Sequence, residues 1–523
     1  MNETPDTPLP PRSPLIAAFL SAIVPGAGQA WERRFGAAAL FFLPVAALAL
    51  AAGVAAGASS LPALAGSLLA PGALTSILVL DVALLAWRVL AVIDAWRAAR
   101  QGATAGPSGP HRTRTAFGAV ALVAILVFVS APHALAGWYA SAAAGAVAEI
   151  FTAPDSDPLA GIGGDMAPGA TLPGDANAIV LASPSSAPGD AAGAPTAVPG
   201  SPTPTPVGSY GPAVPTPSPT PTPLMSRVNV LLVGIDSGPG RNEALTDTMI
   251  VVSLDPVGKT VSMMSIPRDT VNVPLGDGAV YQPKLNSLLG FATRNPGAFP
   301  GRKPIRVLKD AIGGLVGLPI AYYASVDLPG FITVIDAIGG IGVYVREPLA
   351  DYRYREFGYN GFFIDAGCHH LDGKAALAFA RIRYSLGQND FTRASRQQQV
   401  LVAARDQLVR KGLLLDVPAL FGALGKTIRT DLPQSLAPTL AALASEIDAR
   451  DVTQAVMQPP LVAYGQNGYG SVLFPDLAAI RSVADGLFSA TGTPPVAWPP
   501  ASPTPTPDPN RAKAPRPTPP VCR

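Results

Sequence analysis

The chain of 523 residues is poor in charge and in cysteine, and each scarcity excludes a class of protein. Only 14% of its residues are charged and the net charge is +2, so no overall field attracts nucleic acid. The two cysteines, Cys368 and Cys522, are too few for a disulfide framework, and no Cys-x-x-Cys pair indicates zinc. Any anion-binding site must therefore be built locally.

Several common catalytic motifs are also missing. The sequence contains no GxxxxGK[ST], no GxSxG and no HExxH pattern. His369 and His370 are adjacent, so on a helix or a strand they point apart, which is unsuited to joint metal ligation. They are better interpreted as a polar edge before a helix that Asp372 can cap.

Long apolar runs, in contrast, are abundant at the N-terminal end, and the mean hydropathy is +0.31. Three runs are long enough to cross a bilayer: Ala37–Ala58, Leu74–Ile93 and Ala116–Ala140. The middle run carries Asp81 and Arg88, which must face protein or reach the interface. A shorter run from Leu15, broken by Pro25, either spans or re-enters, so residues 1–140 are predicted to be a membrane region with three or four transmembrane segments.

Basic residues predict the orientation of this region. Arginines precede the first long run and lie between the second and the third: Arg33, Arg34, Arg97, Arg100, Arg112 and Arg114. The positive-inside rule assigns these loops to the cytoplasm, so we expect a multi-pass protein of the cell membrane with its C-terminal half on the extracytoplasmic side. In such an oxidising exterior Cys368 and Cys522 could pair, which the sequence alone leaves open.

The 58 prolines mark two further boundaries. Residues 141–225 and 491–523 are rich in Pro, Ala, Ser and Thr, a composition that cannot bury a core and favours extended polyproline II. Both are predicted to be disordered. For the first, we favour a spacer that lifts a domain off the membrane over unstructured filler, because structured regions flank it.

Residues 226–490 are predicted to be an α/β domain with a central mixed sheet and covering helices. β-Branched runs predict strands at Val228–Ile235, Thr248–Leu254, Thr260–Ile266 and Ile320–Val326, and the turn-like DPVGK makes the second and third antiparallel. Helical patterns follow at residues 329–338, 372–382, 390–409, 421–428 and 435–447.

The stretch ARIRYSLGQNDFTRASRQQQ, Ala380–Gln399, gathers four arginines. Arg381 and Arg383 alternate, so on an extended segment they share a face, and Asp390 lies just before a helix. On that helix Arg393 and Gln397 stack, with Arg396 beside them. A solvated helix face with a capping aspartate is the alternative, but acidic partners four residues away are largely missing, so we favour a site for an anion such as a diphosphate.

Charged groups also follow the predicted strands. Asp236 and Asp247 lie at opposite ends of one glycine-containing loop, and Arg268 with Asp269 follows the third strand. Two converging carboxylates can hold Mg²⁺, although each alone is better explained as a turn residue. Lys284 in PKLNSL is equally common as a surface lysine.

Taken together, DTMIVVSLDP, SIPRDT, KLN, HLDGKAALAFARIRYS and NDFTRASRQQ resemble, in this order, the LytR-CpsA-Psr family. Members are membrane-anchored enzymes that attach polyprenyl-diphosphate-linked glycopolymers to the bacterial cell wall. The resemblance covers Val228–Pro459 and implies an α/β/α-type sandwich with an apolar, lipid-accommodating groove.

The resemblance also implies roles for individual residues. Arginines grip the diphosphate with assistance from neighbouring polar side chains: Arg268, Arg381, Arg383 and Arg393, helped by Gln397, Lys284 and Arg396. Asp236 and Asp247 resemble the carboxylates associated with Mg²⁺, for which Mn²⁺ is an alternative, and Asp269 and Asp390 resemble catalytic residues that orient the arginines. The chain departs from the family in having Leu245 where an arginine is common, a place that Arg241 might fill, and in having more than one N-terminal span.

The implied reaction is phosphoryl transfer from a polyprenyl-diphosphate-linked glycan to a hydroxyl of peptidoglycan or another wall glycan, with membrane lipid as a further partner. Positioning and charge neutralisation dominate such chemistry, and Asp247 or Asp269 is the candidate proton acceptor. Leu245 and the extra spans leave open a sensor that binds polyprenyl phosphate without turnover. A pyrophosphatase acting on the same lipid is the other alternative.

Overall fold

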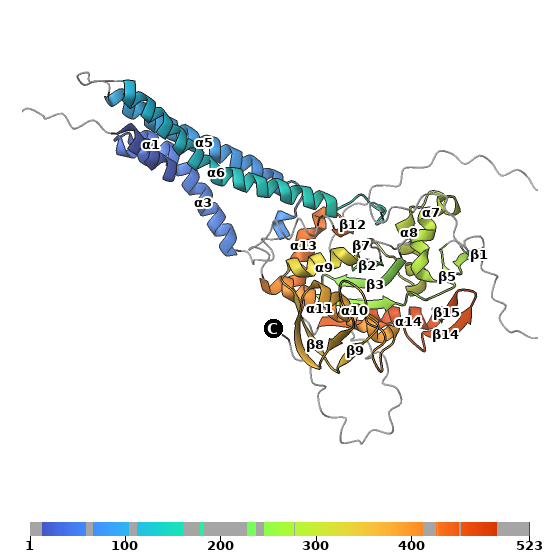
Figure 1. Cartoon of the computed structure of the whole chain (residues 1–523). Helices are drawn as coiled ribbons and strands as arrows, with labels where there is room; N and C mark the ends of the chain where they lie inside the picture. The colour runs from blue at the N-terminus through green and yellow to red at the C-terminus, as the bar shows by residue number, and fades with distance from the viewer. Residues whose placement is uncertain are drawn as a thin grey trace, which may run out of the picture.

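The structure is a computed structural model, in which an N-terminal group of long helices leads into an α/β domain (Figure 1). It describes residues 13–58, 66–103, 112–159, 178–181, 227–236, 245–276, 278–411, 425, 427–448, 451–488 and 522. Most of the predicted linker and tail, Arg241 and most of the predicted helix at 421–428 lie outside these residues.

Three of the N-terminal helices are long and apolar enough to cross a membrane, over Phe35–Gly57, Ala73–Gln101 and Gly118–Ile150. The shorter run near the N-terminus forms a helix of only 10 residues, about 15 Å long, which is too short to span alone. It packs against the second and third long helices. The helices of this region are α1 (Pro14–Ile23), α2 (Ala27–Trp31), α3 (Phe35–Ala58), α5 (Ala73–Ala103) and α6 (Arg112–Ile150).

The two charged residues in the middle of the second long run contact neighbouring helices, as a bilayer interior favours. Asp81 on α5 lies 2.7 Å from the Nδ1 atom of His133 on α6. The guanidinium of Arg88 donates to the backbone oxygen of Ala22 at 2.5 Å. Polar contacts of this kind join the helices to one another.

The third long helix does not end at the predicted boundary near residue 140 but continues to Ile150. The next residues dock directly on the α/β domain: Phe151 forms a β-bridge with Thr430, whose carbonyl accepts from the backbone N–H of Thr152 at 2.8 Å. Beyond them, Asp155 pairs with the buried Lys309 at 2.6 Å. The chain thus reaches the domain within a few residues of the helix.

This docking changes the interpretation of the proline-rich tract. Strand β1 (Ile179–Leu181) lies within the predicted linker and pairs with β6 (Ala279–Tyr281) of the domain. Leu181 and Arg227, the described residues on either side of positions 182–226, therefore both belong to the domain, and the central sheet begins after Arg227. A segment with both ends on the domain does not separate that domain from the membrane, so the spacer interpretation does not fit the described residues.

The domain is built on a mixed six-stranded sheet of order β12-β7-β2-β3-β4-β13. As predicted, β3 and β4 are antiparallel and joined by the DPVGK turn, whereas β2 with β7 and β4 with β13 run parallel. The bounds are β2 (Val228–Asp236), β3 (Leu245–Asp255), β4 (Thr260–Ile266), β7 (Tyr322–Asp327), β12 (Ile428–Thr430) and β13 (Val452–Val456).

Alternation along the strands divides the sheet into two covered faces. Leu231, Val233 and Ile235 enter the main core, whereas Leu232 and Gly234 face the other layer. Helices on the core side are α7 (Leu288–Arg294), α8 (Pro304–Val316) and α14 (Leu477–Phe488), and helices on the other side are α9 (Leu328–Ala337), α10 (Gly373–Arg381) and α11 (Asp390–Lys411) (Figure 1). The result is an α/β/α sandwich.

Short elements complete the domain around these layers. Antiparallel pairs are β8 (Ile341–Val345) with β11 (Gly367–Leu371), β9 (Leu349–Asp351) with β10 (Phe362–Ile364), β14 (Val462–Asn467) with β15 (Gly470–Pro475), and β5 (Val273–Pro274) with β6. The remaining helical elements are η2 (Leu285–Ser287), η3 (Pro296–Ala298), η4 (Gln434–Leu436) and α13 (Ala437–Glu446).

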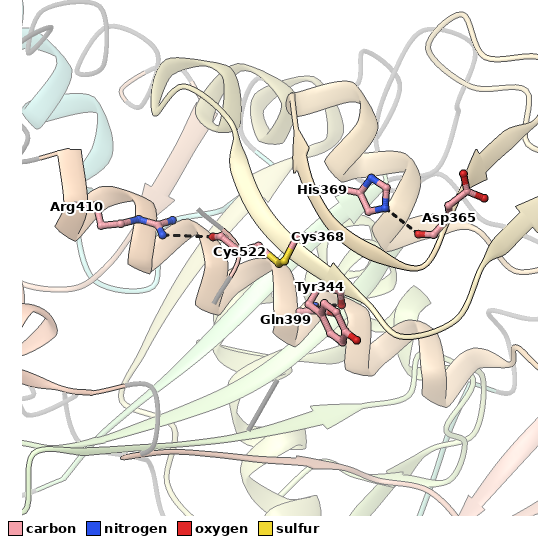
Figure 2. The surroundings of a disulfide bond; sticks show 7 residues. All are labelled: Tyr344, Asp365, Cys368, His369, Gln399, Arg410 and Cys522. Atoms are coloured by element: carbon pink, nitrogen blue, oxygen red, sulfur yellow. Dashed lines mark hydrogen bonds between the residues drawn. A yellow bond between two sulfur atoms is a disulfide. The ribbon is translucent and has the colours of Figure 1, made fainter. Parts of the chain in front are cut away.

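The two cysteines form a disulfide that ties the end of the chain to β11 (Figure 2). The carbonyl of Cys522 accepts from the guanidinium of Arg410 at 3.5 Å. A Cβ atom on Gly342, in the neighbouring strand, would lie 2.5 Å from that carbonyl, so only glycine fits there. The adjacent histidines contact separate backbone oxygens, those of Asp365 and Gly339, and share no metal-like geometry.

Candidate functional site

An apolar groove separates the central sheet from α9, α10 and α11. Its cavity volume is about 260 Å³. Aliphatic and aromatic side chains of both layers line most of it: Leu232, Ile250, Val326, Leu328, Phe331, Leu377, Val400 and Leu401. Polar residues complete the lining, namely Asp247, Thr248, Ser325, Asp327, Arg381, Arg383, Arg393 and Gln397. The groove thus combines a hydrocarbon-like interior with a cationic region.

The first two arginines come from the C-terminal end of α10. Arg381 is the last residue of that helix, so the expected extended Arg-x-Arg segment begins one residue later, at Ile382. Helix α10 starts at the predicted cap, where the Asp372 carboxylate accepts from the N–H of Ala375 at 2.8 Å. The turn from helix to extended backbone brings both guanidinium groups to the groove.

The third arginine comes from the first turn of α11. Asp390 is the first residue of this helix, and the N-cap is Asn389, whose side-chain oxygen accepts from the N–H of Thr392 at 2.9 Å. Asp390 is thereby free to bond elsewhere: it lies 2.6 Å from Arg393 and 4.0 Å from Arg383. It joins the two arginine-bearing segments.

A β-bulge directs Asp247 into the site. In the register of β2 and β3, Ile235 opposes Thr246 and Gly234 opposes Thr248, which leaves Asp247 between them without a partner residue. Such an extra residue bends the strand and re-aims its side chain. The Asp247 carboxylate accepts from Arg268 at 2.8 Å and lines the groove.

Three more carboxylates hold the arginines in place. Asp236, at the end of β2, lies 3.3 Å from Arg381, whose guanidinium also makes two contacts with Glu356, at 3.0 and 3.1 Å. Asp269 lies 3.5 Å from Arg268 and 2.8 Å from Lys284. Apart from Asp390, which pairs with Arg393 within α11, the acidic partners of the arginines come from other parts of the chain.

Arg396 differs from the other predicted diphosphate ligands. Its guanidinium donates to the backbone oxygens of Phe379 at 2.8 Å and Ile382 at 2.5 Å, and to the side chain of Gln388. The side chain is buried and lies outside the groove lining. The structure therefore places Arg396 beneath the site, where it holds the α10–α11 connection.

The electrostatics of the site reflect the crowding of cations. Burial and the neighbouring Arg383 lower the pKa of Arg393 to about 10. Burial alone would raise the pKa of Asp247, but the charge of Arg268 and its hydrogen bond hold it below its ordinary value. Burial opposes the charge on Arg381 too, yet Asp236 and Glu356 raise its pKa. An added anion would relieve the repulsion between Arg393 and Arg383.

Three further residues contact the site but were not predicted from the sequence as site residues. Glu356 pairs with Arg381 from an irregular loop. Asp351 accepts from the backbone N–H groups of Arg383 at 2.9 Å and Tyr384 at 3.1 Å. Asn286, within the KLN motif, donates to Asp247 at 3.5 Å. Only the last stood in a quoted motif.

The predicted metal pair fits a magnesium ion only together with a substrate. Asp236 and Asp247 lie at the same end of β2 and β3, and each has an arginine partner. Among the described residues there is no group of three His, Cys, Asp or Glu side chains able to hold a metal. Because Mg²⁺ commonly uses one or two carboxylates plus phosphate oxygens, the two aspartates suit that role.

Fold and site together define a class: an α/β/α domain preceded by apolar helices long enough to cross a membrane, with an apolar groove lined at one part by arginines and carboxylates, as suits an amphiphilic anion. The sequence model of the LytR_cpsA_psr family matches residues 218–476. This part of the chain is a LytR-CpsA-Psr domain, which confirms the resemblance. Leu245, the departure from the family, is the first residue of β3 and lies opposite Asp236.

Named relatives carry the same kind of domain. The chain is 31% identical over 205 residues to the polyisoprenyl-teichoic acid–peptidoglycan teichoic acid transferase TagU of Halalkalibacterium halodurans, covering 39% of this chain and 60% of the relative. It is 33% identical over 214 residues to TagU of Oceanobacillus iheyensis, covering 41% and 61%. The match thus spans about three fifths of these relatives' length.

Similar solved structures cover half of the chain. TagV of B. subtilis shares 25% identity at a TM-score of 0.39 and is covered to 98% of its length. TagT bound to LI-WTA shares 20% identity at a TM-score of 0.37, covered to 89%. Because both TM-scores are below 0.5, we draw no conclusion from these likenesses.

Proposed function

We propose that the protein is a membrane-anchored phosphotransferase that moves a glycopolymer phosphate from a polyprenyl-diphosphate carrier to a sugar hydroxyl of a peptidoglycan-type wall glycan. The observation that carries this proposal is the groove: apolar along its length and lined at one part by Arg381, Arg383 and Arg393. A polyprenyl chain matches the apolar part, and a diphosphate matches the guanidinium groups. The wall transferases named TagU support the same chemistry.

In the proposed reaction, the acceptor hydroxyl oxygen attacks the sugar-proximal phosphorus. A new P–O bond forms, the bond from that phosphorus to the bridging oxygen breaks, and polyprenyl monophosphate leaves. The diphosphate charge is neutralised by Arg381, Arg383 and Arg393. Arg268, which pairs with Asp247, is a fourth cation at the site. The carboxylates of Asp236 and Asp247 would hold Mg²⁺, or Mn²⁺, which supplies further positive charge at the phosphate oxygens.

The hydroxyl proton passes to a carboxylate, for which Asp247 and Asp269 are the candidates. The pKa of Asp247 is held low by Arg268 while the two remain paired. Asp269 follows Arg268 in the sequence and pairs with it at 3.5 Å, and it also pairs with Lys284 at 2.8 Å. It therefore lies near the same guanidinium group as Asp247.

We place the domain on the extracytoplasmic side of the membrane. The arginines flanking the spans predict this orientation by the positive-inside rule. The Cys368–Cys522 disulfide supports it independently, because such bonds persist in oxidising compartments. The diphosphate bond itself supplies the energy, so no nucleotide is required.

The test uses the full-length protein in detergent, a synthetic polyprenyl-diphosphate saccharide and a soluble wall-glycan oligosaccharide. We expect polyprenyl monophosphate and phosphate-linked acceptor in equal amounts, with loss of both after divalent-cation removal and recovery with Mg²⁺. Polyprenyl monophosphate with free sugar phosphate would instead indicate a pyrophosphatase. Donor binding without any product would indicate a sensor, the alternative that Leu245 and the additional spans favour.

A further inference from the structure

Exposed aromatic side chains gather beside the arginine cluster. Beyond the membrane helices, the aromatic residues described as exposed are Tyr352, Phe363, Tyr384 and Tyr464. The first three lie on two adjoining segments, the strand pair β9–β10 with the residues after β9, and the loop after α10. Exposing aromatic rings to water costs free energy. A group of such rings near a polar site therefore indicates a binding surface.

Two side-chain contacts pair these residues, and the peptide bond between Tyr352 and Arg353 links the two pairs. Together Tyr352, Arg353, Phe363 and Tyr384 form what we call the aromatic ledge. The rings of Tyr352 and Phe363 meet edge to face at 4.9 Å. The guanidinium of Arg353 lies over the ring of Tyr384 at 4.7 Å. Leu386, two residues further on, is 99% exposed.

Hydrogen bonds fix the ledge to the reaction site. Asp351 accepts from the backbone N–H groups of Arg353, Arg383 and Tyr384 at 2.9, 2.9 and 3.1 Å. The N–H of Ala350 donates to Ser385 Oγ at 3.0 Å. One buried carboxylate therefore sets the position of both the site arginine Arg383 and the two ledge residues. The ledge begins one residue from a group that lines the groove.

We propose that the aromatic ledge binds the acceptor glycan strand, an inference that rests on the proposed phosphotransferase function. Sugar rings have apolar C–H faces that stack on aromatic rings, and their hydroxyl rims accept hydrogen bonds from guanidinium groups such as that of Arg353. The ledge extends from Tyr384, beside Arg383, to Phe363 on β10. Its two contact pairs, Tyr352–Phe363 and Arg353–Tyr384, offer rings for more than one sugar of a polymer.

The acceptor is the reactant that requires such a surface. The donor sugar is covalently linked to a diphosphate and a lipid, and the groove with its arginines already holds those groups. The acceptor has no link to either, so its hydroxyl must be positioned by contacts of its own. The apolar groove, the arginines and the ledge then follow the order of lipid, diphosphate and acceptor in the reacting complex.

The test compares Tyr384→Ala, Tyr384→Phe and a control, Val257→Ala, in the full-length protein with the donor and acceptor named above. Val257 is 67% exposed in the β3–β4 turn. We expect Tyr384→Ala to raise the acceptor KM roughly tenfold with the donor KM and kcat unchanged, and Tyr384→Phe and the control to match the wild type. An unchanged acceptor KM would overturn the proposal, and a rise confined to the donor KM would assign the ledge to the donor sugar instead.

Direct binding separates this proposal from the proposed function. Titration of the soluble oligosaccharide into the protein should show binding to the wild type and to Val257→Ala, weakened about tenfold in Tyr384→Ala. If the wild type forms no product while this pattern holds, the phosphotransferase reaction fails and the glycan surface stands. Equal binding by all three proteins refutes the ledge whatever the outcome of the turnover assay.

Discussion

Arg393 and Arg396 lie one turn apart on α11, yet their guanidinium groups have different surroundings. Arg393 lines the groove, pairs with Asp390 and is repelled by Arg383. Arg396 points at the backbone oxygens of Phe379 and Ile382. The difference arises because buried carbonyl oxygens require hydrogen-bond donors. The end of α10 presents two such oxygens to the Arg396 guanidinium.

We therefore predict that Arg396→Ala acts on stability rather than on substrate contact. Loss of the guanidinium leaves the carbonyls of Phe379 and Ile382 without this donor, which should cost about 3 kcal/mol of unfolding free energy. Thermal unfolding in detergent measures it, with Arg306→Ala, an exposed arginine on α8, as the control. Unchanged stability with weakened donor binding would return Arg396 to the diphosphate ligands.

Asp351 gives a prediction with a defined pH dependence. Burial alone would raise its pKa, but the N–H groups of Arg383 and its neighbours lower it below the ordinary value. A carboxyl group with a lowered folded-state pKa stabilises the protein above about pH 4, and this stabilisation is lost as pH falls through the folded pKa. Asp351→Asn should cost about 1–3 kcal/mol at pH 7, with a difference from wild type that shrinks in acid.

The control for this prediction is Asp310→Asn. Asp310 pairs with Arg306 on the surface of α8, so its loss should change stability by less than about 1 kcal/mol. A difference between Asp351→Asn and wild type that stays constant from pH 7 to pH 3 would contradict the assigned role of the Asp351 carboxylate.

Among the helices and strands, features that depend on the local sequence were predicted, whereas features that depend on how strands pair were not. The β-branched runs predicted β2, β3 and β4, and DPVGK predicted the turn, because both depend on neighbouring residues. The bulge at Asp247 was not predictable, since it depends on how two strands twist against each other. Glu356 lies in a loop without periodicity, so only the fold brings it to Arg381.

The end of α10 shows the same division. The Asp372 cap and the helical period predict its start, but the alternation of Arg381 and Arg383 predicts an extended segment that begins one residue too early. Helix ends are set by tertiary contacts, here the donors of Arg396 that satisfy the last carbonyls. Residue type and spacing thus indicated candidate site residues, whereas the directions of their side chains depend on the packing of α10 on α11.

Across the whole molecule, the α/β domain is held directly beneath the end of α6. The β-bridge of Phe151 with Thr430 and the Lys309–Asp155 pair precede the proline-rich tract. Because residues 182–226 begin and end on the domain, we predict that deleting residues 190–215 leaves transfer from a donor embedded in liposomes within about twofold of wild type. A spacer role predicts at least a tenfold loss in liposomes but none in detergent.

The disulfide gives a whole-molecule prediction about the compartment. Cys368 and Cys522 should react with a thiol-alkylating reagent only after reduction when the protein is isolated from the membrane of its host. Cys522→Ser provides the matched control, since it frees Cys368 and should yield one labelled thiol per chain without reduction. Full labelling of the unreduced wild type would contradict the extracytoplasmic placement.

The proposed role of the groove arginines, to hold a lipid-linked diphosphate for transfer, is tested most directly by Arg381→Ala and Arg383→Ala. Each variant should lower donor affinity and the transfer rate about 10–100-fold, the loss expected of charge-assisted hydrogen bonds. Thermal unfolding should stay near that of Arg306→Ala. Transfer at the wild-type rate by both variants would contradict the account.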